Sequence, residues 1–344
     1  MPDTVVIAAD PAAELNAFLK TREYSKIGVI TDENTRRHCY PLIEKGIPEH
    51  FSISVPAGEE YKNIETCSKI WQALTVEAFD RHSVLVVLGG GVLGDMAGFC
   101  AATFKRGIDF VLMPTTLLAQ VDASIGGKLG VDFNRLKNHI GVFSLPPLTL
   151  IHTGFLQTLP PREYRSGFAE IIKHALISDA EVWKKIKSSP IDAQPLDYLI
   201  RHSIAYKSKV ATEDPKEKGL RKVLNAGHTI GHALESHLMA TAHKVLHGEA
   251  IAAGLLAEAW VSMKKGFLSQ AELDDIRGYI IDQFGKVQWP QGDEEAIAGL
   301  TVQDKKNKGN KVLCVLLEGI GKARWDCEIS PAEVKGALSF YRSI

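Results

Sequence analysis

Short apolar runs alternate with amphipathic segments over the first 158 residues of the chain. The runs at 26–31, 83–91 and 109–116 are rich in Val, Ile and Leu, and the intervening segment 63–79 has the apolar spacing of a helix. Apolar strands that alternate with helices are typical of a parallel sheet covered by helices. The pattern therefore predicts an N-terminal α/β domain over residues 1–158.

The hydrophobic pattern changes near residue 160, where two adjacent prolines interrupt the chain. Long segments with helical spacing follow, for example RSGFAEIIKHAL, LDYLIRHSIAYKSKVA and LHGEAIAAGLLAEAWVSM. One late stretch, 311–325, has two apolar runs separated by a glycine turn, which predicts a β-hairpin. We expect a second, mainly helical domain over residues 159–344, and hence a fold of the α/β plus all-α class.

Length and charge agree with this division and exclude some function classes. A chain of 344 residues exceeds the size at which single cores stop growing, so two domains are expected. The 40 basic and 41 acidic residues give a net charge of −1, so the sequence has no overall field for binding nucleic acid or acidic membranes. Any site for an anion must therefore be local.

The cysteines and the apolar segments indicate the compartment. The five cysteines are far apart and form no CxxC pair, as expected for a protein kept in a reducing environment. The N-terminal sequence MPDTVVIAAD lacks the features of a signal peptide, and nowhere do 18 apolar residues run together. We expect a cytoplasmic protein without a membrane anchor.

The first chemical motif is a glycine-rich turn that follows an apolar run. Gly89, Gly91 and Gly94 satisfy GxGxxG at the predicted start of a helix, where free backbone N–H groups can bind a pyrophosphate. A glycine turn that only packs a helix on a strand is the alternative. Asp32 ends an earlier strand and is a better partner for a ribose than Asp109, which begins one.

Polar residues gather in the otherwise apolar segment LLAQVDASIGGKLGVDFNRLKNHIGVF. Asp122, Lys128, Lys137 and Asn138 lie there beside glycines, and Arg106 adds a further positive charge just upstream. Lysines beside glycine turns commonly bind phosphate or carboxylate groups. A solvated surface charge is the usual role of any single lysine, so only the clustering favours an anion site.

The sequence NAGHTIGHALESH contains the strongest candidates for metal ligands. His228 and His232 are four residues apart, so on a helix they project from one face. A surface helix with solvated histidines is the alternative. Other candidates occur nearby, but the spacing alone does not select a third ligand; they are Glu170, Lys173, His174, His243, His247 and Glu249.

Taken together, seven ordered motifs resemble the 3-dehydroquinate synthase family of sugar phosphate cyclases. They are GGGVLGDMAGF, ATFKRG, PTTLLAQVDASIGGKLGV, LKNHIGVF, FLQTLPPREYRSGFAEIIKHALI, EKGLRKVLNAGHTIGHALE and LHGEAIAAGLLAE. The resemblance implies an N-terminal Rossmann-like, parallel-sheet NAD-binding domain and a C-terminal helical domain that binds zinc, with Co²⁺ as a possible replacement. It also implies a homodimer that acts on a small sugar phosphate.

The same resemblance implies roles for individual residues. The zinc ligands would be Glu170, His228 and His247, while His232 would face the substrate and His237 would be a solvated side chain without a role. The other catalytic residues would be Asp122, Lys128, Lys137, Asn138 and Lys173. The substrate would be bound by Arg106, Lys207, Arg221, Asn225 and Lys306, with Lys305 as the alternative to Lys306. NAD would be bound by Asp32, Asn34, Glu59, Lys62, Gly90, Gly91, Val92, Asp95, Thr115, Thr116, Lys128, Lys137, Phe155, Thr158 and Glu163.

The activity that the resemblance implies belongs to the shikimate pathway of aromatic amino acid biosynthesis. It converts 3-deoxy-D-arabino-heptulosonate 7-phosphate to 3-dehydroquinate and phosphate through transient oxidation by NAD, elimination, re-reduction and aldol closure. Three other functions remain open at this stage. They are a sister cyclase such as 2-deoxy-scyllo-inosose or 2-epi-5-epi-valiolone synthase, a metal-dependent polyol dehydrogenase that releases NADH, and a binding protein without activity.

Overall fold

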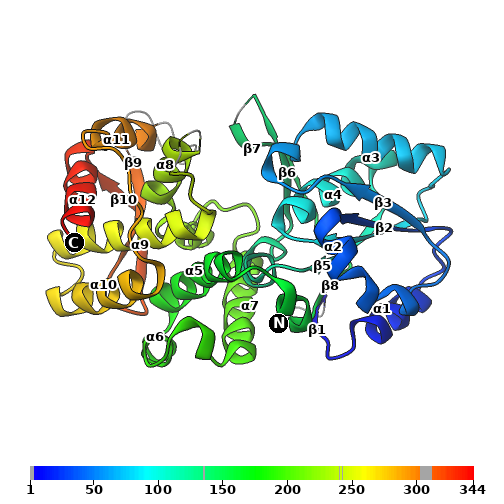
Figure 1. The fold of residues 1–344 in the computed structure, drawn as a ribbon, viewed down its shortest axis with the longest axis horizontal. Coiled ribbons are helices and arrows are strands. Elements are labelled where there is room, and N and C mark those ends of the chain that lie inside the picture. The colour runs from blue at the N-terminus through cyan, green and yellow to red at the C-terminus, as the bar shows by residue number, and fades with distance from the viewer. Residues whose placement is uncertain (1–3, 135, 240, 242, 303–311) are drawn as a thin grey trace. The chain divides into compact units, whose positions relative to one another are not determined.

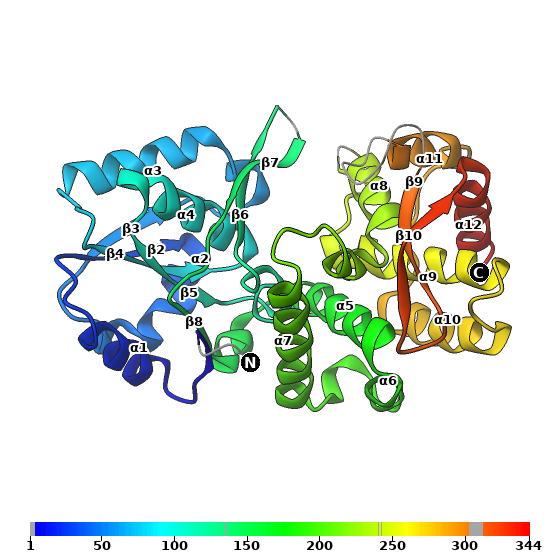
Figure 2. The same ribbon diagram turned by 180° about the vertical axis from the view of Figure 1, so that it is seen from behind.

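The computed structural model describes residues 4–134, 136–239, 241, 243–302 and 312–344. The chain divides into two compact units, residues 1–160 (unit 1) and 161–344 (unit 2). Figures 1 and 2 show the ribbon from opposite sides.

Unit 1 is built on a parallel sheet of six strands in the order β1-β8-β5-β4-β2-β3. Every neighbouring pair in this sheet is parallel. The strands are β1 (Val5–Ile7), β2 (Ile27–Asp32), β3 (Phe51–Val55), β4 (Val84–Gly89), β5 (Asp109–Pro114) and β8 (Leu148–Ile151). The apolar runs at 26–31, 83–91 and 109–116 thus correctly predict β2, β4 and β5.

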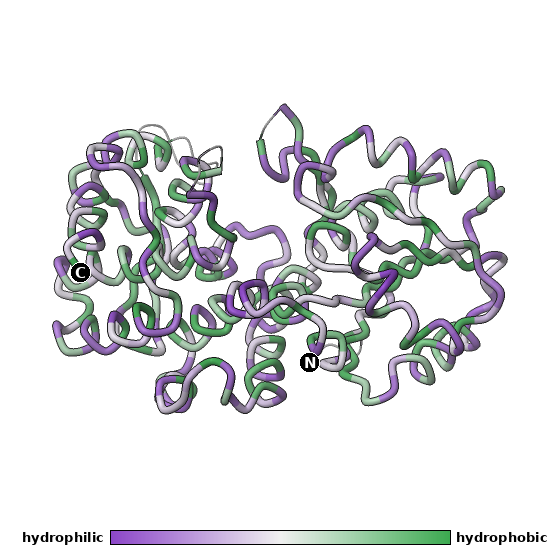
Figure 3. Tube along the Cα trace, viewed as in Figure 1, coloured by the Kyte–Doolittle hydropathy of each residue, from purple (hydrophilic) through white to green (hydrophobic). Residues whose placement is uncertain are grey.

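The central strands of unit 1 are buried on both faces, which explains their uninterrupted hydrophobicity. On β4, Leu85 and Val87 pack into one core with α3 (Ile64–Val76) and α4 (Gly91–Thr103), whereas Val84, Val86 and Leu88 pack into a second core with α1 (Pro11–Lys20). Figure 3 shows these strands in hydrophobic colours. The helices of the unit are α1 (Pro11–Lys20), α2 (Glu33–His38), α3 (Ile64–Val76) and α4 (Gly91–Thr103).

A separate antiparallel hairpin extends unit 1 beyond the sheet. It consists of β6 (Lys128–Phe133) and β7 (Leu136–Phe143). A single π-helical turn, Ala119–Ala123, precedes it; such turns are rare and often occur at functional sites. The Gln120 side chain donates to the carbonyls of Pro114 and His152, which ties this turn to the ends of two strands.

Unit 2 is mainly helical and contains one two-stranded antiparallel sheet. Its helices are α5 (Pro161–Ser178), α6 (Ala180–Lys187), α7 (Leu196–Glu213), α8 (His228–Leu238), α9 (His247–Lys264), α10 (Gln270–Phe284), α11 (Glu294–Val302) and α12 (Pro331–Ser343). The strands β9 (Val312–Leu317) and β10 (Ala323–Ile329) form the hairpin that the sequence predicts, and Gly319 and Gly321 adopt positive φ in its turn.

Helix α9 lies at the centre of unit 2. It contacts α5, α8, α10 and α12, and it is buried on nearly all sides from Gly248 to Ala259. A helix that is apolar all round is expected in such a position. Because α9 contacts the helices on either side of it, residues on its surface can organise α5 and α8.

The fold class expected from the sequence is confirmed by these elements. The division at residues 158/159 into an NAD-binding and a zinc-binding domain stays a prediction. None of the helices in the described part of the chain is long and apolar enough to span a membrane.

Candidate active site

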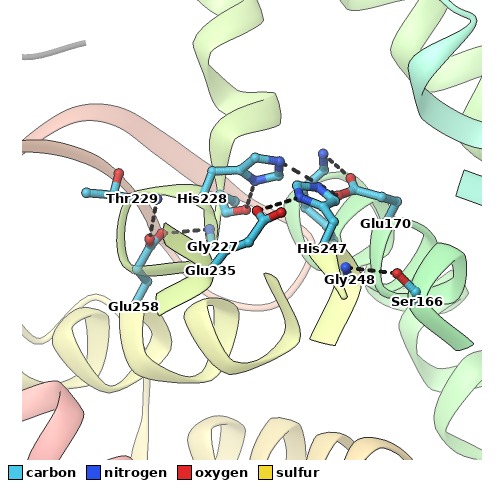
Figure 4. A network of polar contacts seen from close by, with 11 residues as sticks. Ser166, Glu170, Gly227, His228, Thr229, Glu235, His247, Gly248 and Glu258 are labelled. Atoms are coloured by element: carbon cyan, nitrogen blue, oxygen red, sulfur yellow. Dashed lines mark hydrogen bonds and ion pairs between the residues drawn. The ribbon is translucent and has the colours of Figure 1, made fainter. Parts of the chain in front are cut away.

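Three helices of unit 2 bring a carboxylate and two imidazoles together. Oε1 of Glu170, in the middle of α5, lies 3.7 Å from Nε2 of His228 at the start of α8 and 3.4 Å from Nε2 of His247 at the start of α9. Figure 4 shows the two rings and the carboxylate pointing toward one another. Two imidazoles and one carboxylate are a donor set that binds zinc and leaves a coordination position open.

Close packing between α5 and α9 fixes two of these groups. The Gly248 N–H, next to His247, donates to Oγ of Ser166, which lies one turn before Glu170. A Cβ on Gly248 would lie 1.8 Å from the carbonyl oxygen of Ser166, so only glycine permits this approach. The two helices therefore meet backbone to backbone beside the candidate ligands.

The pKa values of the two imidazoles are shifted in opposite directions. Burial lowers the pKa of His228 well below its usual range, and the positive charge of Lys173 lowers it further. Burial alone would also lower the pKa of His247, but hydrogen bonding to Glu170 and Glu235 outweighs it and raises the pKa to about 9. His228 is thus neutral and could accept a cation directly, whereas His247 would have to give up a proton to do so.

His232 also belongs to this cluster. One ring nitrogen from each of His228, His232 and His247 lies within 4.8 Å of the others. The pair selected by helical spacing therefore converges as the sequence predicts. Whether His232 faces the substrate, as the resemblance implies, stays a prediction.

The structure corrects the expectation for His237 and removes Glu249 from the candidate metal ligands. His237 is not a solvated side chain, because its Nε2 lies 2.7 Å from Oδ2 of Asp293 and the side chain is only 20% exposed. Glu249 does not join His247, because its carboxylate accepts two hydrogen bonds from Arg162 and a third from the Leu246 N–H. Spacing along a helix does not reveal such partners from distant segments.

The substrate candidates of unit 2 lie on elements that contact one another. Lys173 on α5 forms an ion pair with Glu170, and both side chains are 1% exposed. Lys207 on α7 is buried, and α7 contacts both α5 and the 3₁₀ segment Leu220–Asn225, which carries Arg221 and Asn225.

Polar contacts shape the loop that holds Arg221 and Asn225. The Asp214 carboxylate accepts the N–H groups of Lys218, Gly219 and Arg221. The Asn225 side chain donates to Glu217, which has a positive φ. Lys305 and Lys306 lie outside the described residues.

In unit 1 the glycine motif has the expected context, since Gly89 ends β4 and Gly91 begins α4. A Cβ on Gly90 would lie 3.0 Å from Cγ2 of Thr116, so the glycine turn and the loop after β5 are in contact. A Cβ on Gly94 would meet no atom of the described residues within 4 Å. Packing within unit 1 therefore does not explain Gly94, and the open space fits a ligand that approaches α4 closely.

The buried Lys62 connects the cofactor candidate Asp95 to the catalytic candidate Asn138. Nζ of Lys62 lies 2.7 Å from Oδ2 of Asp95 on α4 and 2.6 Å from Oδ1 of Asn138 on β7. Burial opposes its charge, but Asp95 and Glu59 outweigh burial and raise the pKa of Lys62. This lysine therefore holds the glycine helix and the hairpin together.

Asp132 is a polar residue in this region that sequence reasoning did not assign. Its carboxylate accepts the Asn138 N–H at 2.7 Å, and Asn138 has a φ of 49°, in the left-handed region that Asn adopts more readily than most residues other than glycine. Burial raises the pKa of Asp132. Its place in the same polar segment as Lys137 and Asn138 was the available signal.

The remaining candidates of unit 1 are placed as follows. Asp32 caps α2 through Thr35, the Lys137 Nζ lies 3.5 Å from Glu59, Lys128 is exposed at the start of β6, and Asp122 lies in the π-helical turn. Arg106 has a φ of 70° in a turn after α4, and the Phe155 side chain is buried in the core. Asn34 lies on α2, Val92 on α4, Thr115 directly after β5 and Thr158 in the 3₁₀ segment Thr153–Thr158, while Glu163 lies on α5 of unit 2.

Two buried glutamates around the histidine cluster were missed as well. Oε2 of Glu235 lies 3.2 Å from Nδ1 of His247, and Glu258 accepts backbone N–H groups at the start of α8. Each had a signal in the sequence, since Glu235 lies two helical turns after His228 and Glu258 interrupts the apolar run AIAAGLLAEAW.

Comparison with known families and proteins gives consistent matches. The model of the 3-dehydroquinate synthase N-terminal family matches residues 52–166, and that of the C-terminal family matches residues 167–307. A 3-dehydroquinate synthase of Parabacteroides distasonis is 40% identical and covers 98% of this chain and 97% of its own. One from Campylobacter concisus is 41% identical and covers 95% of each chain.

Solved structures share the fold. The 2-epi-5-epi-valiolone synthase ValA of Streptomyces hygroscopicus subsp. jinggangensis, with NAD⁺ and Zn²⁺ bound, has a TM-score of 0.87 at 26% identity and covers 98% of this chain and 96% of its own. A 2-deoxy-scyllo-inosose synthase complexed with carbaglucose-6-phosphate, NAD⁺ and Co²⁺ has a TM-score of 0.85 at 23% identity, with 97% and 95% covered. A probable glycerol dehydrogenase of Sinorhizobium meliloti has a TM-score of 0.65 at 15% identity, with 100% and 98% covered.

Proposed function

The chain belongs to the 3-dehydroquinate synthase family, and we propose that it performs the reaction of that family on 3-deoxy-D-arabino-heptulosonate 7-phosphate. The products are 3-dehydroquinate and phosphate, in the shikimate pathway of aromatic amino acid biosynthesis. The observation that carries the proposal is the convergence of Glu170, His228 and His247 beside the buried Lys173. A metal site with an adjacent cation suits a substrate that has vicinal hydroxyls and two anionic groups.

Both cofactors fit the residues present. Glu170, His228 and His247 would hold Zn²⁺ or Co²⁺, and the open space at Gly94 beside the turn Gly90–Gly91 would accept the pyrophosphate of NAD. When bound, NAD supplies a reversible hydride acceptor, and the metal lowers the pKa of the hydroxyl to be oxidised.

The protein's own groups bind and orient the substrate. Lys207 and Arg221 are buried cations, and they suit its carboxylate and phosphate because charge-assisted hydrogen bonds are strong away from water. Asn225, held by Glu217, can orient a hydroxyl. Lys173 forms an ion pair with Glu170, and His232 can exchange a proton at the edge of the histidine cluster.

Identification of the product tests the proposal against the other functions. The enzyme would be incubated with the heptulosonate phosphate, glucose 6-phosphate and glycerol, and phosphate release, NADH and the carbocyclic product would be measured. We expect phosphate and 3-dehydroquinate from the heptulosonate phosphate alone, without net NADH. Phosphate release from glucose 6-phosphate would favour a sister cyclase, and NADH from glycerol would favour a polyol dehydrogenase.

We further propose that the enzyme is a homodimer in which Arg106 serves the partner's phosphate site. Arg106 is exposed in a turn after α4, which supports a role toward a second chain, and its positive φ is the kind of backbone strain found at functional positions. Arg106→Ala and Glu170→Ala chains should each be nearly inactive, while mixed dimers contain one complete site of two. Co-refolding of equal amounts should therefore restore about a quarter of the wild-type phosphate release. No recovery in verified mixed dimers would contradict the shared site.

We propose a cytoplasmic location on the basis of the thiols. Cys314 and Cys327 are opposite each other across the β9–β10 hairpin, and both are free. Opposed thiols in one hairpin persist most readily in a reducing compartment. Cell fractionation checks this, and recovery of the enzyme outside the cytoplasmic fraction would contradict it.

A further inference from the structure

Helix α8 begins at its candidate metal ligand without a cap of its own. The residue before His228 is Gly227, which has no side chain and a φ of 76°. The free N–H groups at this end are instead accepted by Glu258 on α9. Its two carboxylate oxygens accept the N–H groups of Gly227 at 2.7 Å, Thr229 at 3.1 Å and Ile230 at 3.1 Å. Figure 4 shows the Glu258 carboxylate beneath this turn.

The position of Glu258 depends on an unusually close approach of the two helices. A Cβ on Gly254 would lie 2.0 Å from the Gly227 carbonyl oxygen, and one on Gly231 would lie 2.9 Å from the Ala250 carbonyl oxygen. Glu258 follows His247 by about three helical turns, so both lie on the face of α9 that packs against α8. A single face of α9 thus supplies one candidate ligand and the cap of the helix that supplies another.

The hydrogen bonds of Glu258 act on the backbone on both sides of His228. Gly227 and Thr229 are its direct neighbours, and the His228 Nδ1 lies 3.0 Å from the Ala226 carbonyl oxygen. Because a carbonyl oxygen can only accept, Nδ1 carries the proton and Nε2 keeps its lone pair for a metal. The orientation of that lone pair therefore depends on a turn of backbone that Glu258 holds.

A buried carboxylate is costly unless its charge is compensated, and Glu258 is only 3% exposed. Three N–H donors and the positive end of the α8 dipole provide that compensation. We propose that Glu258 is a positioning residue that presents His228 to the metal and thereby sets metal affinity. This inference rests on the metal role of His228 in the proposed function.

Metal titration of the full-length, metal-free enzyme tests the proposal. Glu258→Gln preserves shape but removes the charge and turns an N–H₂ group toward backbone donors. We expect its Kd for Zn²⁺, measured against a competing chelator, to rise about 10–100-fold, as for other residues that support metal ligands. The d–d absorption of the Co²⁺-loaded variant should also differ from that of the wild type.

Ser262→Ala is the matched control. Ser262 is fully buried one turn further along α9, donates to the Glu258 carbonyl and accepts the Leu317 N–H. Its loss removes hydrogen bonds of the same helix without touching the start of α8, so zinc affinity should stay within about twofold of wild type. A folded Glu258→Gln enzyme with wild-type affinity, or equal weakening in both variants, would overturn the proposal.

A measurement on the wild type covers the case in which Glu258→Gln does not fold. Hydrogen exchange of the metal-free enzyme should already show protected amides at Thr229 and Ile230, because Glu258 accepts them without metal. Protection that arises only after zinc addition would mean that the metal orders this turn, and the proposal would be wrong. A wild-type enzyme that binds no zinc would instead contradict the metal centre of the proposed function.

Discussion

The two units hold their candidate site residues in different ways. In unit 1 the candidates for the cofactor lie in loops after strands, at the starts of α2 and α4 and on a half-exposed hairpin, and ion pairs such as Lys62 with Asp95 connect these segments. In unit 2 the candidates for the metal lie on packed helices, where glycines allow backbones to touch. A dinucleotide needs a long surface that several loops can share, whereas an ion needs a few donors fixed in place.

This difference implies different responses to mutation. Substitutions in unit 2 that destabilise the fold should also weaken metal binding, because the same helices form the core and the candidate metal centre. Changes in unit 1 should weaken cofactor binding while the sheet remains intact. The following experiments test this contrast.

The largest effect is expected at the histidine cluster. Glu170→Ala should abolish both metal binding and activity, because it removes the only carboxylate proposed as a ligand. His232→Ala should keep the metal and lower kcat by about 10²–10⁴-fold, as for the loss of a proton-transfer group. Metal content by atomic emission and phosphate release distinguish the two, and equal metal loss would make His232 a ligand.

Substitution of one glycine in each unit tests this contrast directly. Gly254→Ala places a methyl group 2.0 Å from a backbone oxygen, so it should lower the free energy of unfolding by about 3 kcal/mol. Gly94→Ala meets open space within the described residues and should leave Tm unchanged or slightly higher, as Ala favours helices. In Gly94→Ala only the affinity for NAD should fall. Thermal melts and NAD titrations measure both, and unchanged NAD affinity in Gly94→Ala would favour the packing role of the glycine motif.

Lys62→Met tests the network of unit 1. It removes the ties to Asp95 and Asn138 and leaves the Asp95 carboxylate without its cation, so NAD affinity should fall by about tenfold. Zinc content should not change. Lys69→Met, at an exposed position of α3, is the control. A loss of zinc in Lys62→Met would contradict the expectation that substitutions in unit 1 affect NAD binding and leave metal binding unchanged.

The smallest effect concerns a surface pair of unit 2. Burial would raise the pKa of Glu249, but the hydrogen bonds from Arg162 and the Leu246 N–H lower it below its usual value. The stability from this pair is thus present above the unfolded-state pKa of about 4.3 and is lost as the pH falls through the folded-state pKa.

Arg162 is 57% exposed, so solvent should limit the pair to about 0.5 kcal/mol. Melts of wild type and Arg162→Ala at pH 7 and pH 3.5 measure it. The difference between the two proteins should shrink at the lower pH, and a difference that grows would show that another group is responsible.

The sequence predicts the elements of this protein better than their contacts. The apolar runs identify β2, β4 and β5, because strands buried on both faces must be continuously hydrophobic. His228 and His232 converge because four residues make one helical turn. The sequence marks Glu235 and Glu258 as unusual, but it does not give their partners or that of Asp293, since each contact joins segments whose approach depends on packing between helices.

The order of strands in unit 1 has a consequence for synthesis on the ribosome. The first strand, β1, pairs only with β8 in the sheet, and the Ala8 carbonyl meets the His152 ring across 144 positions of sequence. At about 5–20 residues per second, the start of the chain waits roughly 7–30 s for its partner to emerge. From the synthesis of β5 until β8 follows, β5 is an open edge, so nascent chains are most exposed to misassociation just before unit 1 closes.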